Sequence, residues 1–101
     1  MASQHLTFHT DPGHGWLEVL RADLVRFGIA DSISQFSYSM GQVVFLEEDC
    51  DAPKYLEALR SRAIDYIIRD VHYNRDAPIR AMNPYRAPAC PINRGQQPLS
   101  L

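Results

Sequence analysis

The chain has 101 residues, of which 46% are hydrophobic and 22% charged, and its formal net charge is −2. This composition is typical of a folded globular domain and excludes a wholly disordered or fibrous chain, while the length suits one hydrophobic core. The small net charge argues against a surface that binds phosphate backbones in general. Residues 1–53 nevertheless sum to −6 and residues 54–101 to +4. This asymmetry indicates either an electrostatic contact with a partner or a second copy of the chain, or two halves that neutralise each other within one fold.

The first expected element is a β-hairpin. Residues 6–9 alternate between apolar and polar side chains, which predicts a half-buried strand, and residues 16–19 predict its partner. Between them, Asp11, Pro12 and Gly13 are typical of a tight turn. We expect Asp11 to bond back to the backbone, Pro12 to occupy the first corner and Gly13 to supply a positive φ at the next.

A helix is expected to follow the hairpin. Leu20, Leu24 and Phe27 stand at helical spacing, and the helix is predicted to end at Gly28. Glycine suits the left-handed position after a helix, and Ile29 then falls where a Schellman closure places an apolar residue against Leu24.

A second hairpin is predicted by residues 36–40 and 43–46, which a two-residue turn joins. The first strand alternates, with Phe36, Tyr38 and Met40 on one face. The second is a continuous apolar run, which is typical of a strand in the middle of a sheet.

The last regular elements are a helix and a strand. Asp51 or Asp49 is expected to cap the helix, Pro53 to lie in its first turn and Arg62 to mark its approximate end. Residues 64–73 then predict a strand that carries apolar groups on both faces.

These elements predict an α+β fold in the order ββαββαβ: a small antiparallel or mixed sheet of about five strands with two helices on one face. After Asn74, prolines interrupt regular structure. We therefore expect residues 1–85 to form one domain and residues 86–101 a Pro-rich flexible tail, which is either an unpacked terminus or a segment that docks on a partner.

Three segments, residues 11–17 (DPGHGWL), 28–31 (GIAD) and 46–51 (LEEDCD), carry a resemblance to a known family. In this order they resemble a family of small bacterial proteins found in chromosomes, plasmids and prophages, over roughly residues 6–80. The resemblance implies no defined activity. Carriage on mobile elements implies an accessory, inhibitory or regulatory binding role.

Two clusters contain metal-ligand types. His9, Asp11 and His14 bring two imidazoles and a carboxylate together, as a zinc site would need, and the acids of residues 47–51 could hold the cation of a magnesium-dependent nuclease. Histidines beside a turn and acids at a helix entrance explain both clusters without a metal. We assign no catalytic residue, expect no cofactor and keep a small metal-dependent hydrolase as an alternative function.

Cys50 and Cys90 lie far apart and outside any metal-binding spacing, which predicts free thiols. Acidic neighbours disfavour the Cys50 thiolate, whereas a position at a helix entrance favours it, and the sequence does not rank the two effects. No apolar stretch is long enough for a membrane span, and the first residues lack the features of a secretion signal. We expect a cytoplasmic protein without membrane contact.

The predicted function is non-enzymatic binding of a macromolecule, above all of a protein, with a homodimer as one form. Weak nucleic-acid binding through the basic C-terminal half is a second alternative. For Trp16 a role as a core anchor is favoured over a role in binding, and the tyrosines qualify only if they are partly exposed. The candidate binding residues are His14, Trp16, Tyr66, Arg69, Tyr73 and Tyr85.

Overall fold

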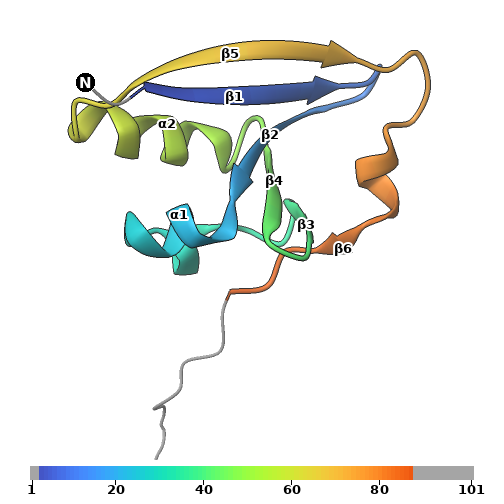
Figure 1. The fold of residues 1–101 in the computed structure, drawn as a ribbon. Coiled ribbons are helices and arrows are strands. Elements are labelled where there is room, and N and C mark those ends of the chain that lie inside the picture. The colour runs from blue at the N-terminus through green and yellow to red at the C-terminus, as the bar shows by residue number, and fades with distance from the viewer. Residues whose placement is uncertain (1–2, 88–101) are drawn as a thin grey trace, which may run out of the picture.

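The computed structural model describes residues 3–87, which form a six-stranded mixed sheet with two α-helices and two short 3₁₀-helices (Figure 1). The predicted α+β class and the order ββαββαβ are confirmed, and a short sixth strand is added. The elements are β1 (Ser3–Thr10), β2 (Gly15–Leu20), α1 (Arg21–Arg26), η1 (Ala30–Ser32), β3 (Tyr38–Met40), β4 (Val43–Glu47), α2 (Ala52–Ser61), β5 (Asp65–His72), η2 (Pro78–Ala81) and β6 (Asn83–Pro84).

The strands lie in the order β5-β1-β2-β4-β3-β6, and all neighbours are antiparallel except β1 and β5. The β1–β5 pair runs in unbroken register from Ser3 opposite Asp65 to Thr10 opposite His72. β2 pairs with β1 only from Thr7 onward and then turns away to pair with β4. The paired strands β5 and β1 therefore extend beyond the rest of the sheet, as the long arrows at the top of Figure 1 show.

Both α-helices pack on one face of the sheet and enclose the main core. Leu24 of α1 and Leu59 of α2 are fully buried there against Leu17 and Leu46. Each such side chain contributes about 1.5–3 kcal/mol through burial. A smaller core on the opposite face joins the sheet to η2, and its buried members are Trp16, Phe45, Ala77 and Ile79.

Both helices end in a Schellman closure. Gly28 has φ +73°, and the amide of Ile29 donates to the carbonyl of Leu24 at 3.0 Å, which confirms the predicted end of α1. α2 closes in the same way through the amide of Ile64, but its left-handed residue is Ala63, at φ 55°. A Cβ is disfavoured in this conformation, so α2 ends with local backbone strain.

The prediction of a strand over residues 36–40 was wrong in extent. β3 begins only after Ser37, and Phe36 and Met40 are 65% and 63% exposed, whereas Ser37 is fully buried. The hydroxyl of Ser37 donates to the carboxylate of Asp51 and accepts from the amide of Glu47. A polar network therefore occupies the inner side of this segment and turns the apolar side chains outward.

Within residues 3–87, no helix combines the length and the apolar character needed to cross a membrane. The predicted tail begins at residue 86, and residues 88–101 of it lie outside the described part of the chain. Directly after β6, Tyr85 is buried, and its amide donates to the carbonyl of Ser37 at 2.7 Å.

Candidate functional site

A hollow of about 430 Å³ opens beside η2, the β1–β2 turn and the C-terminal end of β4. Five separate stretches of the chain contribute to its wall, so the fold rather than any local motif assembles it. Its lining combines aromatic rings with charged groups, which is the composition of a specific binding site. The lining residues are His14, Trp16, Gln35, Phe36, Tyr38, Glu47, Asp49, Cys50, Arg80 and Pro84.

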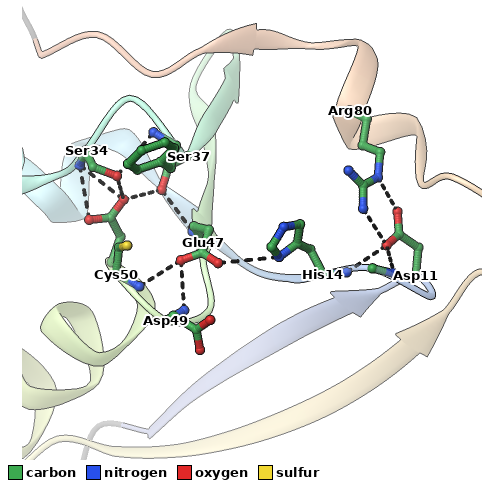
Figure 2. A network of polar contacts seen from close by, with 11 residues as sticks. Asp11, His14, Ser34, Ser37, Glu47, Asp49, Cys50 and Arg80 are labelled. Atoms are coloured by element: carbon green, nitrogen blue, oxygen red, sulfur yellow. Dashed lines mark hydrogen bonds and ion pairs between the residues drawn. The ribbon is translucent and has the colours of Figure 1, made fainter.

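Glu47 is one of the charged groups that line this hollow, and Figure 2 shows its polar contacts. Its side chain is only 9% exposed. One carboxylate oxygen, Oε1, accepts hydrogen bonds from the amides of Asp49 (2.8 Å) and Cys50 (2.7 Å). The other, Oε2, lies 3.7 Å from Nδ1 of His14 and accepts no hydrogen bond within residues 3–87. A largely buried carboxylate thus keeps one oxygen free to receive a donor.

Aromatic rings line the hollow beside this carboxylate. The Trp16 and Tyr38 rings meet edge to face, with centroids 6.3 Å apart, and the His14 ring lies 6.1 Å from that of Trp16. Phe36 adds a ring that is largely exposed. Aromatic faces carry a negative quadrupole, so they attract cations as well as apolar groups.

An ion pair between Arg80 and the buried Asp11 holds the positively charged group of the hollow in place. The Asp11 carboxylate accepts from Nε (2.6 Å) and Nη2 (2.9 Å) of Arg80 and from the amide of Ala77 (2.9 Å). The Arg80 guanidinium holds the pKa of Asp11 well below its usual range; burial opposes this, and backbone amides reinforce it. The same guanidinium lies over the Trp16 ring, 5.2 Å from its centroid. Because Asp11 pairs with it, Arg80 adds little net charge to the hollow.

The predicted tight turn at Asp11 is confirmed, since Oδ1 of Asp11 accepts from the amides of Gly13 and His14, both at 2.9 Å. The predicted positive φ of Gly13 was wrong. The glycine matters instead because it leaves space: a Cβ at this position would lie 2.7 Å from Nη2 of Arg80. Its missing side chain lets the guanidinium reach Asp11.

Asp51 holds the loop that carries Phe36. Its fully buried carboxylate accepts from the amide (3.1 Å) and hydroxyl (2.6 Å) of Ser34, from the hydroxyl of Ser37 (2.5 Å) and from Nζ of Lys54 (3.1 Å). Burial raises the pKa of Asp51, but the serine and lysine hydrogen bonds outweigh burial and lower it below the usual value. The predicted side-chain cap of α2 was wrong, because this carboxylate faces the serines instead of the helix amides.

Cys50 has an exposed free thiol at the rim of the hollow. Desolvation, followed by the neighbouring Glu47 carboxylate, raises the pKa of this thiol above its usual value. Desolvation and the acidic neighbours both raise the pKa, so both disfavour the Cys50 thiolate. At neutral pH Cys50 is a poor nucleophile.

The predicted metal-ligand clusters do not converge. Nε2 of His9 lies 2.8 Å from Glu18, and Nδ1 lies 3.0 Å from the hydroxyl of Tyr73, while Asp11 is taken by Arg80. Among residues 3–87, no group of three or more histidine, cysteine, aspartate and glutamate side chains is arranged to hold a metal ion. Neither the candidate zinc set nor the acidic set of residues 47–51 is therefore arranged as a metal site in the described part of the chain.

Two of the six predicted binding residues, His14 and Trp16, line the hollow. Trp16 is only 2% exposed, so it also anchors the smaller core, which was its alternative role. Tyr85 does not meet the condition of partial exposure. It is 4% exposed, and its hydroxyl donates to the carbonyl of Ala30 at 2.7 Å.

The other three predicted residues lie near the opposite edge of the sheet. Tyr66 and Arg69 are on β5, where Tyr66 packs partly against the main core and Arg69 is exposed. Tyr73 follows β5, contacts the smaller core and pairs its hydroxyl with His9. The structure therefore does not gather the six residues into one site.

Sequence reasoning missed the roles of Glu47, Phe36 and Arg80. Arg80 lies 69 positions from Asp11, so no local pattern reveals their pairing. Glu47 did carry a signal, because it directly extends the apolar run of residues 43–46. A carboxylate at the end of a central strand is a candidate for a buried charge.

Comparison of the chain with models of protein families, with curated protein sequences and with solved structures gives no match. The resemblance to small bacterial and mobile-element proteins stays a prediction.

Proposed function

We propose that this protein is a binding module that receives a cationic side chain, arginine or lysine, of a partner protein in the hollow around Glu47. The observation that carries the proposal is Oε2 of a side chain that is 91% buried: Nδ1 of His14 lies 3.7 Å away, within ion-pair range, but this oxygen accepts no hydrogen bond within residues 3–87. A buried carboxylate oxygen without a donor is unfavourable, and a cationic N–H group removes that cost by forming a charge-assisted hydrogen bond.

The surroundings of Glu47 suit a cation. Asp49 adds a second negative charge to the lining, whereas the charge of Arg80 is balanced by Asp11. The exposed ring of Phe36 and the partly exposed ring of Tyr38 offer surface for the methylene stem and for the charged head. A guanidinium stacks on aromatic rings and pairs with carboxylates at the same time, so arginine is the better fit of the two side chains.

The same chemistry disfavours the alternatives at this hollow. Phosphate groups of a nucleic acid would meet Glu47 and Asp49, which repel them. The metal-dependent hydrolase lacks a convergent ligand set among residues 3–87. Protein binding is therefore the function that the hollow supports best.

The test is a titration with N-acetyl-arginine amide, followed through the fluorescence of Trp16, which is the chain's one tryptophan. We expect saturable binding with a dissociation constant on the order of 1 mM, as suits one side chain detached from its protein. N-acetyl-citrulline amide has the same shape without the charge and should bind about tenfold more weakly.

Glu47→Gln tests the role of the carboxylate. Its amide oxygen can still accept from Asp49 and Cys50, so the turn is expected to persist while the charge is lost and affinity falls about tenfold. Glu48→Gln is the matched control, because it removes the same charge from a residue outside the lining. Equal binding of the arginine and citrulline probes, or equal losses in both variants, would refute the proposal.

A further inference from the structure

The two edges of the sheet differ in a way that bears on assembly. β6 has only two residues, one of them Pro84, which cannot donate a ladder hydrogen bond, so this edge is blunted. The other edge is β5, with eight residues and no proline, in unbroken register with β1. Among residues 3–87, no strand pairs with its outer side. It is a long open edge, and such edges pair with another strand.

The outward side chains of β5 are partly apolar. Ile67 is 57% exposed and Ile68 38% exposed. Asp65 and Arg69 flank Ile67 at equal distances along the strand and, within residues 3–87, neither has an ion-pair partner within 4 Å. Because side chains alternate across a strand, Asp65, Ile67 and Arg69 share one face.

We infer that β5 pairs antiparallel with β5 of a second copy of this chain, through a two-fold axis at Ile67. In an antiparallel ladder each residue lies directly opposite one residue of the partner strand. When two copies of one strand pair in this way, one residue lies opposite its own copy, and the two-fold axis passes between these two copies. With the axis at Ile67, Asp65 of each copy lies opposite Arg69 of the other. Tyr66 then lies opposite Ile68.

Neighbouring registers lack this complementarity. An axis at Ile68 places Ile67 opposite Arg69 and Tyr66 opposite Asp70, with no pair of opposite charges. An axis at Arg69 places this cation against its own copy. Opposite charges directly across a ladder stabilise it and like charges destabilise it, so the charge pattern selects the register at Ile67. The resulting dimer has one sheet that runs through both copies, and it leaves the hollow around Glu47 free, so this inference is independent of the proposed function.

Charge reversal tests the pairing. In Asp65→Arg alone, and in Arg69→Asp alone, both cross-strand pairs become like-charged, and we expect the dimer dissociation constant to rise about tenfold or more. A mixture of the two variants restores both pairs between unlike chains. Native mass spectrometry should therefore show a heterodimer in the mixture and little homodimer of either variant, a result that misfolding of the variants cannot produce.

Disulfide trapping tests the register, in a chain with Cys50→Ser and Cys90→Ser. Opposed Cβ atoms at the axis are about 4.5–5.5 Å apart, close enough for a disulfide after a small adjustment. Ile67→Cys should form a dimer on oxidation much faster than Ile68→Cys does. Faster trapping at Ile68, a mixture without heterodimer, or an unmodified chain that stays monomeric across a concentration series would overturn the inference.

Discussion

Replacing Asp51 by asparagine should destabilise the protein strongly, although the two side chains have nearly the same shape. The carboxylate accepts three hydrogen bonds from Ser34 and Ser37 and one from Lys54. Asparagine exchanges one acceptor oxygen for an NH₂ group, which would face donors. Loss of one charge-assisted bond costs about 1.5–3 kcal/mol, and the donor left without an acceptor adds about 1–3 kcal/mol.

The expected total is about 3 kcal/mol, which lowers the melting temperature of a domain this size by roughly 15 °C. Urea unfolding followed by Trp16 fluorescence measures the change in the free energy of unfolding. Asp49→Asn is the matched control: this residue is exposed, lies two positions away and undergoes the same change of charge. The control should remain within about 0.5 kcal/mol of the unchanged protein.

The pH dependence of this effect has a definite sign. Because the pKa of Asp51 is lowered on folding, its contribution to stability is complete above the unfolded-state pKa of about 3.9 and is lost as the pH falls through the lower folded-state value. The difference in stability between the unchanged protein and Asp51→Asn should therefore shrink in acid. A difference that stays constant below pH ~4, or that is already small at pH ~7, would refute this account of the buried network.

Two further sets of variants test local features. Ala63→Gly should raise the free energy of unfolding by about 1 kcal/mol and Gly28→Ala should lower it by a similar amount, because both positions have a positive φ. Urea unfolding measures both changes, and a lower free energy of unfolding in Ala63→Gly would contradict the strain ascribed to the end of α2. In a Cys90→Ser chain, Cys50 should react with iodoacetamide more slowly than a small free thiol at neutral pH, because the pKa of its thiol is raised. The further substitution Glu47→Gln should speed this reaction. An unchanged rate would show that the Glu47 carboxylate does not control the thiol.

Much of the fold could be predicted because its signals are local. The hairpin around Asp11, the end of α1 at Gly28 and the buried central strand β4 each depend on residues that are close together in the sequence. Turn geometry, left-handed glycine and hydrophobic periodicity act over a few positions. Such features can be read without knowing the rest of the structure.

The site could not be predicted in the same way, because its contacts join distant segments. Phe36 was expected to lie on a strand, but β3 begins only at Tyr38, and the hydrogen bonds of Ser37 to Asp51 and Glu47 bury Ser37 beside an exposed Phe36. A polar residue with a specific buried partner outweighed the alternation of apolar side chains. Beyond His14 and Trp16, which were predicted as binding residues and line the hollow, the position of Glu47 at the end of a buried strand gave a hint of the hollow from sequence.

The acidic cluster of residues 47–51 shows why residue type alone was misleading. Its acids have different tasks: Glu47 supports the turn with one oxygen and faces the hollow with the other, Asp51 is buried among serines, and Asp49 lines the rim. Burial and hydrogen bonding separate groups that look alike in the sequence. Glu47 and Asp49, acids of the cluster that suggested a cation site or a helix cap, instead line the hollow.

The most direct test of the central claim is to map, by NMR, which backbone amides respond when N-acetyl-arginine amide is added. The account predicts that the largest shifts occur at Asp49 and Cys50, whose amides donate to Glu47, and at the indole of Trp16. These shifts should disappear in Glu47→Gln. Shifts that cluster away from the hollow, or that persist in this variant, would contradict a cation-binding role for Glu47.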